Sequence, residues 1–269
     1  MDHYFKNRIS DTLLYPVAGR AYASKNYPQY FHFKDNETIL RKLHHLKIEL
    51  SQTQSFIYGL RHLYSVEESK KFIQKHPMAS IVNIGCGLDC LFPEINNGQI
   101  KFYNMDLPDV ITFRENFYPL AQGEYHLSCN FLDDSFTKMI DFRKEHGVLF
   151  LMTGVIHYFP PKDIKKLIHI IGQHYPGAIL LFDCKNISAM RKSNREIAKK
   201  GIEDLRMKFF IKDPLEIKSW SPMIQEISIN YDLDSVLKDR GQLPFGLQMT
   251  LMAFKKMKSL YFVKLTFQE

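Results

Sequence analysis

Several features that would indicate particular protein classes are scarce or absent in this sequence. No apolar run is long enough to span a bilayer, and the first residues, MDHYFKNRIS, are polar and lack the apolar core of a secretory signal. Only four cysteines occur in 269 residues, and no C-x-x-C pair or Cys/His cluster has the spacing of a zinc site. We therefore expect a cytoplasmic protein with reduced thiols, no metal ion and no membrane contact.

Positive charge exceeds negative charge, and part of the excess is local. The formal net charge is +7, and ten Lys or Arg residues lie between Lys185 and Lys218 with few acids among them. Such a stretch is most often the solvated face of a helix, but it is also a suitable surface for an acidic partner or substrate. An acidic carrier protein is therefore a candidate partner. No recognised nucleic-acid-binding motif accompanies the charge, so we expect no nucleic-acid partner.

The pattern of apolar residues changes near Pro77. Residues 1–76 carry apolar residues at helical spacing and predict a cap of three helices, whereas 77–269 predicts the main domain. In that domain short apolar runs alternate with helical segments, which predicts an α/β fold with a doubly wound, mostly parallel sheet. Two of the predicted helices are SFTKMIDFRKEH and PPKDIKKLIHIIGQHY. The segment 249–267 predicts one or two final strands at an antiparallel edge.

The most informative motif, VNIGCGLDC, ends the first predicted strand. Gly85 and Gly87 interrupt an apolar run, which is costly unless the backbone turns tightly or a ligand comes close to it. In doubly wound sheets ligands bind at the carboxyl ends of the strands. Cys90 occupies the third small position of a dinucleotide motif. The pattern therefore favours an adenosine with an amino-acid tail over a nicotinamide dinucleotide.

Three residues at the ends of the next two predicted strands suit an adenosine ligand. Asp106 follows the glycines by about 20 residues, where an acid accepts hydrogen bonds from ribose hydroxyls. Its alternative role is a helix N-cap. Asn130 and Phe131 follow the third predicted strand, where an amide would bond the adenine edge and a ring would stack on its face. For Phe131 the alternative is core packing.

His157 and Tyr158 follow the fourth apolar run and are the candidate catalytic residues. The reference pKa of histidine lies near neutrality, so His157 is a candidate general base. A hydrogen-bonded residue in the cavity wall is the simpler interpretation of His157, and packing is the simpler interpretation of Tyr158. A carboxylate acceptor would need no base, whereas a phenol or alcohol would benefit from one.

Taken together, these segments resemble the leucine carboxyl methyltransferase family, including its bacterial branch of polyketide O-methyltransferases. The resemblance rests on HPMASIVNIGCGLDCLFPEI, FYNMDLP, ISDTLLYPVAGRAYASKNYP, SQTQSFIYGLRHLY and DRGQLPF, and it covers nearly the whole chain. It implies a class I methyltransferase fold with a seven-stranded sheet and S-adenosylmethionine as cofactor. It also implies O-methylation of a small metabolite, a carrier-bound acyl or polyketide intermediate, or a carboxylate, as in secondary metabolism.

The resemblance also implies a role for particular residues. Arg61 would hold the methionine carboxylate, with Arg20 assisting, because a guanidinium suits a carboxylate. Asn130 and Thr153 replace acids that many relatives carry near the cofactor, which motivates an alternative function, a binding module of the same fold that transfers no methyl group. The residues that the resemblance assigns to the cofactor are Arg20, Arg61, Gly85, Gly87, Asp106, Asn130, Phe131 and Thr153.

Overall fold

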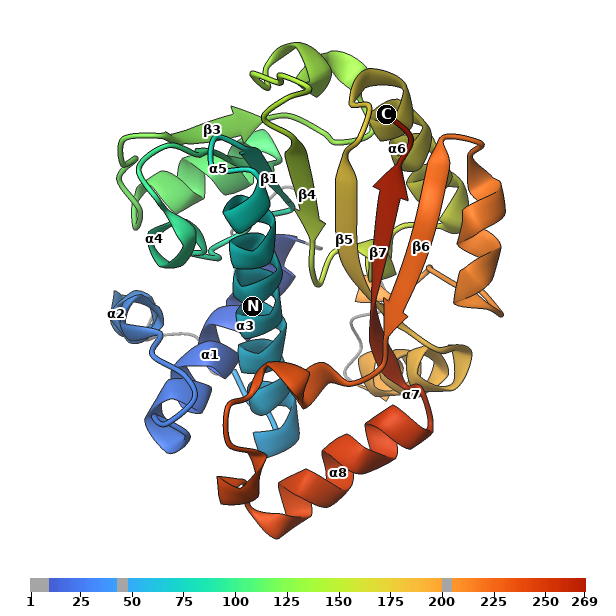
Figure 1. Ribbon diagram of the computed structural model, residues 1–269. Helices are drawn as coiled ribbons and strands as arrows, with labels where there is room; N and C mark the ends of the chain where they lie inside the picture. Colours follow the sequence, from blue (N-terminus) through green and yellow to red (C-terminus); the bar gives the residue numbers. More distant parts are fainter. Residues whose placement is uncertain (1–9, 43–47, 200–204) are drawn as a thin grey trace.

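A mixed sheet with the strand order β3-β2-β1-β4-β5-β7-β6 forms the centre of the described chain (Figure 1). The computed structural model describes residues 10–42, 48–199 and 205–269. The first five strands are parallel, and β7 runs antiparallel to both of its neighbours, β5 and β6. The strands are β1 (Ser80–Ile84), β2 (Lys101–Asp106), β3 (Glu124–Ser128), β4 (Val148–Met152), β5 (Ile179–Lys185), β6 (Ile224–Asn230) and β7 (Leu260–Phe267).

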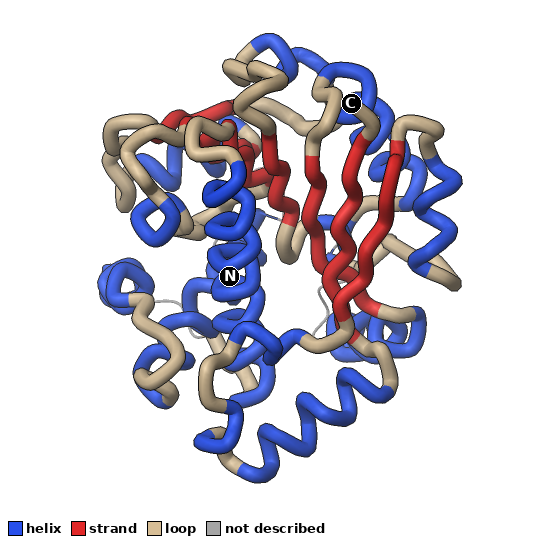
Figure 2. Tube along the Cα trace, in the orientation of Figure 1, coloured by secondary structure: helices blue, strands red, loops and turns tan. Residues whose placement is uncertain are grey.

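Helices lie against both faces of the sheet, as the ribbon and tube drawings show (Figure 1 and Figure 2). All five residues of β4, VLFLM, are buried, since alternate side chains enter cores on opposite faces. Phe150 packs in the core that contains α6, whereas Leu149 and Leu151 pack in the core that contains α3 and α8. The helices are α1 (Leu14–Asn26), α2 (Lys34–Lys42), α3 (Gln52–Lys75), α4 (Phe92–Ile95), α5 (Pro108–Glu115), α6 (Pro161–His174), α7 (Ile187–Lys199) and α8 (Phe245–Lys256).

The long helix α3 joins the amino-terminal helices to the sheet. Ser51 begins it with a capping box, in which Ser51 and Gln54 each accept the other's backbone N–H. At its middle, the ring of Tyr64 stacks on Phe262 of β7 with centroids 3.8 Å apart. The two helices expected at 53–64 and 66–76 are thus one helix. Its second half belongs to the core of the sheet domain. The boundary at residue 76 stays a prediction.

One other expectation for local structure is wrong, and a second, for an antiparallel final strand at the edge, is right except for the edge. The segment SFTKMIDFRKEH forms only a short 3-10 helix, Asp134–Lys138. The helix does not continue because the backbone of Asp141 is hydrogen-bonded to the sheet. Its N–H donates to the Tyr103 hydroxyl, and its carbonyl accepts from Ser80 Oγ. In the segment 249–267 only β7 is a strand, and it lies inside the sheet, so that β6 forms the edge.

Some expectations fall outside the described residues. The polar start of the chain and residues 43–47, the middle of one expected helix, are not described, and α2 ends at Lys42. Within the described segments, no helix is long and apolar enough to cross a membrane.

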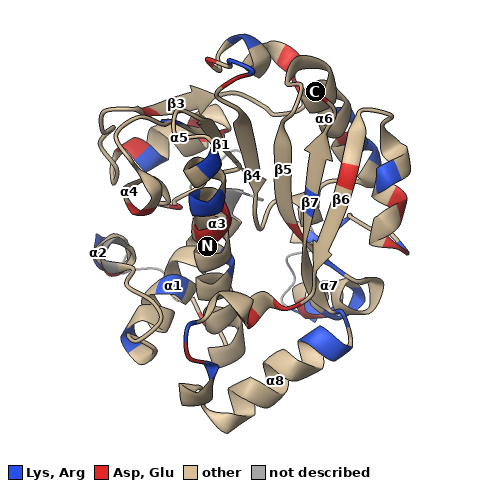
Figure 3. Cartoon of the chain, in the orientation of Figure 1, with Lys and Arg blue, Asp and Glu red and all other residues tan. Residues whose placement is uncertain are grey.

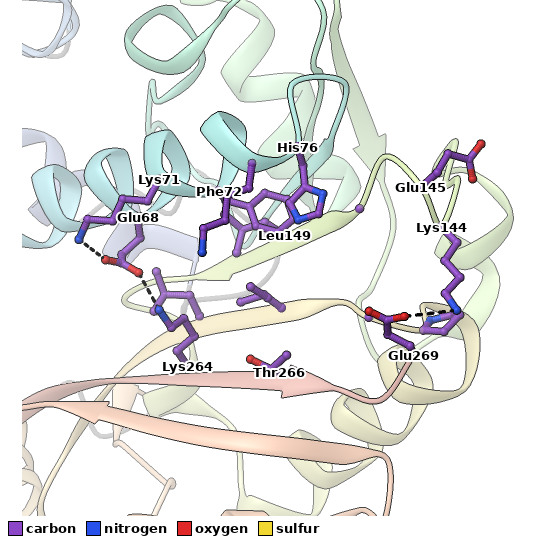
Figure 4. A pocket seen from close by; sticks show the side chains of 16 residues that line it. Glu68, Lys71, Phe72, His76, Lys144, Glu145, Leu149, Lys264, Thr266 and Glu269 are labelled. Atoms are coloured by element: carbon purple, nitrogen blue, oxygen red, sulfur yellow. Dashed lines mark hydrogen bonds and ion pairs between the residues drawn. The ribbon is translucent and has the colours of Figure 1, made fainter.

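A hollow of about 770 Å³ lies between the carboxyl-terminal half of α3 and strands β4, β5 and β7 (Figure 4). Its charged side chains largely neutralise one another. Glu68 pairs with Lys71 at 2.7 Å and with Lys264 at 3.1 Å, and Lys144 lies 3.8 Å from Glu269. The glycine turn after β1 lies at the other end of the strands, in a larger cavity.

Candidate functional site

The larger cavity, of about 1300 Å³, opens at the carboxyl ends of β1, β2, β4 and β5. Helices α1, α3, α7 and α8 supply its walls, and the ends of the parallel strands point toward them in Figure 1. Pockets for single small ligands usually enclose about 300–1000 Å³, so this cavity has room for two molecules side by side. The switch in strand order between β1 and β4 places it where doubly wound folds bind ligands.

The glycine turn after β1 forms one wall of this cavity. Gly85 and Gly87 have φ angles of +66° and +48°, a region that residues with a Cβ rarely adopt. A Cβ on Gly85 would lie 2.5 Å from Val155 Cγ2, so close packing also requires glycine there. The backbone conformation of the turn is therefore sufficient to explain why both positions are glycine. Because glycine has no side chain, the turn also leaves its backbone accessible to a ligand.

Asp106 lies beside this turn, at the end of β2. Its two carboxylate oxygens accept the backbone N–H groups of Gly87 and Leu107, each at 2.8 Å. Burial raises the pKa of Asp106 to about 6, although these two N–H groups favour its ionised form. The residue that precedes α5 as its N-cap is Leu107, not Asp106. Each carboxylate oxygen keeps acceptor capacity for a further donor.

Arg61 of α3 enters the cavity from the opposite wall, where it pairs with Asp183. One guanidinium nitrogen lies 2.6 Å from Asp183 Oδ2, and Asp183 is fully buried at the end of β5. Burial alone would raise the pKa of Asp183, but Arg61, His157 and the Gly154 N–H together outweigh burial and hold that pKa far below its usual value. Asp183 also accepts the N–H of Gly154, at 2.5 Å. Asp183 thereby fixes both Arg61 and the turn that follows β4.

His157 forms part of the same charged cluster. Its Nε2 lies 3.3 Å from Asp183 Oδ2 and 3.3 Å from Arg61, and the side chain is buried. Burial lowers the pKa of His157, so its neutral form prevails at neutral pH. This placement fits the simpler interpretation, a hydrogen-bonded residue in the wall. Tyr158 also lines the cavity, and burial raises its pKa, so it is a poor base.

Arg20 lines the cavity too, but its guanidinium is largely engaged elsewhere. It donates to Asn36 Oδ1 and the Leu88 carbonyl, both at 3.1 Å, and lies 3.2 Å from Asp89. His62 bridges the same Asp89, at 2.7 Å, to Glu94, at 2.6 Å. This network fastens α1 and α3 to the glycine turn, so Arg20 has a structural task whatever it contributes to a ligand.

The remaining predicted residues also line the cavity. Asn130 Oδ1 accepts the Leu132 N–H at 3.0 Å, which shapes the turn after β3. Phe131 is 7% exposed and makes an edge contact with Phe159, with centroids 4.7 Å apart. Thr153 follows β4 directly. The structure thus gathers all eight predicted cofactor residues at one cavity, and their roles there stay predictions.

Sequence reasoning missed Asp183, His62 and Asp89. Asp183 carries the same signal that identified Asp106, an acid at the end of an apolar strand, here GAILLFDCK. His62 had no such signal, because its partners come from distant parts of the chain.

Two donors and one histidine ring nitrogen around the cavity lack partners among the described residues, which favours a polar ligand there. Within the described chain, Arg61 Nε, Asn83 Nδ2 and His157 Nδ1 are buried and have no hydrogen-bond partner. Buried polar groups without partners are rare, and all three residues line this one cavity. A ligand with acceptor groups would satisfy the donors of Arg61 and Asn83.

The sheet order, the glycine turn and the cavity above it define the fold of class I methyltransferases. The chain belongs to the leucine carboxyl methyltransferase family, whose model matches residues 3–172, and this confirms the resemblance that the sequence motifs suggested. It is 21% identical over 178 residues to the tetracenomycin polyketide synthesis O-methyltransferase of Streptomyces glaucescens. That alignment covers 65% of each chain, so the match spans less than two thirds of the relative.

Solved structures show the same fold. A putative methyltransferase from Thermobifida fusca has a TM-score of 0.56 at 14% identity, covering 80% of this chain and 83% of its own. The plantazolicin methyltransferase, crystallised with a triazolic desmethyl-plantazolicin analogue and S-adenosylhomocysteine, has a TM-score of 0.51 at 11% identity, covering 97% of this chain and 100% of its own. Human N-acetylserotonin methyltransferase, crystallised with S-adenosylmethionine, has a TM-score of 0.50 at 10% identity. The match covers 94% of this chain and 72% of the human chain.

Proposed function

We propose that this protein is an S-adenosylmethionine-dependent O-methyltransferase. The observation that carries the proposal is the pairing of the Gly85–Gly87 turn with the Asp106 carboxylate at one wall of a cavity large enough for two molecules. Family membership and the ligands of the solved relatives support it. The acceptor would be a small metabolite, a carrier-bound acyl or polyketide intermediate, or a carboxylate.

The chain supplies groups for each part of such a cofactor. Asp106 would accept the ribose hydroxyls, and Arg61, with its buried Nε lacking a partner within the described residues, would bind the methionine carboxylate. Bound S-adenosylmethionine supplies an electrophilic methyl group; the acceptor oxygen bonds to it while the C–S electron pair stays on sulfur. Burial makes neutral His157 a weaker base than a free imidazole and keeps Tyr158 protonated, so an acceptor already ionised at neutral pH suits this site best.

The basic helix α7 stands at the acceptor side of the cavity. Figure 3 shows its Lys and Arg residues next to the basic end of α8. Arg191, Lys192 and Arg195 are exposed, and Lys192 also lines the cavity. This surface supports an acidic acceptor or acidic carrier protein as the partner, approaching along α7.

Calorimetric titration tests the proposal directly. S-adenosylmethionine and S-adenosylhomocysteine should bind, and NAD should not. Replacing Arg61 by Lys keeps a charge beside Asp183 but loses the guanidinium fork, and should weaken binding by about 1.5–3 kcal/mol. Binding of NAD alone would overturn the proposal, and unchanged affinity in Arg61→Lys would assign the methionine carboxylate to another group.

A further inference from the structure

Lys185 is a cation at the cavity that the cofactor roles above do not use. It is the last residue of β5, lines the cavity and is partly buried. Its Nζ donates to Ser193 Oγ at 3.0 Å, and the sulfur of Met207 lies 3.8 Å away. An ammonium group has three donors, and these two neutral and unequal partners do not balance its charge, which Asp183 offsets only in part.

The acids near Lys185 are committed to other cations. Asp183, two residues earlier, is held by Arg61 at 2.6 Å and contacts His157 at 3.3 Å. Glu196 of α7, which also lines the cavity, lies 3.1 Å from Lys199. Across the described segments, no carboxylate lies within 4.0 Å of the Lys185 ammonium. Burial and the neighbouring charge of Arg61 outweigh the attraction of Asp183 and lower the pKa of Lys185 to about 8, as expected for an ammonium without a carboxylate in direct contact.

Lys185 lies on the side of the cavity that α7 forms. Its contacts, Ser193 and Met207, come from α7 and the segment after it, whereas the glycine turn and Asp106 belong to β1 and β2 at the other side of the sheet centre. We propose that Lys185 binds a negatively charged oxygen of the methyl acceptor and thereby selects anionic acceptors. This inference rests on the proposed function, because it assigns the second half of the cavity to the acceptor.

A pair of probes of equal size but different charge tests this role. Benzoate and benzamide would be titrated into the protein saturated with S-adenosylhomocysteine, with binding followed by ligand-observed NMR. The wild-type protein should bind benzoate about tenfold more tightly than benzamide, because a charged partner strengthens the hydrogen bond to the ammonium. Lys185→Met, which keeps the length of the side chain, should lose the preference, and Lys185→Arg should retain it.

Two lysine controls and one independent readout separate the possible outcomes. Lys166→Met changes an exposed lysine on α6, outside the cavity, and should keep the preference. Loss of the preference in Lys192→Met instead would move the anion site to the mouth of the cavity and overturn the proposal. So would equal binding of the two probes, no binding of benzoate to the wild type, or a preference that survives in Lys185→Met.

Binding of S-adenosylhomocysteine to Lys185→Met is measured in parallel and should match the wild type. If the wild type itself failed to bind S-adenosylhomocysteine, the proposed function would fail, independently of Lys185. Once a methyl acceptor is identified, Lys185→Met should raise the KM for that acceptor, because the variant no longer binds its anionic group. A fall in kcat at unchanged KM would mean that Lys185 acts as a base and does not hold the acceptor.

Discussion

Two carboxylates at the cavity respond in opposite ways to being buried. Asp183 has Arg61 within 2.6 Å, and its pKa is held far below the usual value. Among the described residues, Asp106 has only backbone N–H partners at hydrogen-bond distance, and burial raises its pKa to about 6. A cation compensates a buried charge more fully than two N–H dipoles do. The first acid therefore stays ionised, whereas the second titrates close to neutrality.

Cofactor affinity should consequently depend on pH through Asp106. The ionised carboxylate is the form that accepts two ribose hydroxyls, so affinity for S-adenosylhomocysteine should fall as pH drops through about 6. One pH unit below that value the loss should be about tenfold. Asp106→Asn should bind weakly at every pH and show no such inflection. Calorimetric titration over this range measures both proteins, and a flat wild-type profile would contradict the ribose role.

His62 should make the stability of the fold fall with rising pH, in the alkaline range. Burial by itself would lower its pKa, but Asp89 and Glu94 outweigh burial and raise it to about 9, from 6.5 in the unfolded chain. The stabilisation is therefore complete below 6.5 and is lost as pH rises through about 9. It should amount to about 3 kcal/mol, because each unit of pKa difference corresponds to about 1.4 kcal/mol. Urea unfolding of wild type and His62→Gln across this range gives the difference, which should shrink as pH rises; a constant difference would show that the ion pairs contribute nothing.

At the scale of elements, the packing of α1 on α3 sets the position of Arg61. Gly19 of α1 touches the Tyr58 ring so closely that a Cβ would overlap it, and Tyr58 lies one helical turn from Arg61. Gly19→Ala should destabilise the protein by about 1–3 kcal/mol through overpacking. Gly246→Ala is the matched control, since Gly246 lies in α8 with nothing within 4 Å. That change should be neutral or slightly stabilising. Equal effects of the two substitutions in thermal unfolding would disprove this account of the contact.

Local pattern predicted those elements whose burial is regular. The apolar runs of β1, β4 and β5 gave the parallel strands, and the glycine turn with Asp106 indicated the site. The local pattern failed to predict secondary structure where contacts between residues far apart in the chain determine it. Residues 249–256 alternate like a strand but form α8, and the segment after Lys138 is held by Ser80 and Tyr103 instead of continuing as a helix. The Asp183 cluster and the His62 network could not be predicted, because each unites residues far apart in the chain.

At the scale of the whole molecule, α3 couples the amino-terminal helices to the sheet. The stack of Tyr64 on Phe262 and the ion pair between Glu68 and Lys264 connect α3 to β7, while Gly19 and Arg20 connect it to α1 and the glycine turn. Thermal unfolding should therefore be a single cooperative transition in scanning calorimetry. A separate early transition of the first 76 residues would indicate that the cap unfolds independently.

The position of β7 in the sheet has a consequence for folding during protein synthesis. β7 is the latest of the seven strands in chain order, yet it fills the gap between β5 and β6 and bonds to both. A chain that emerges from the ribosome from its amino end can assemble β1 to β5 early, but β5 keeps an open edge until residues 260–267 are translated. We therefore expect the nascent polypeptide to need shielding of that edge, for example by a chaperone, until translation passes this point.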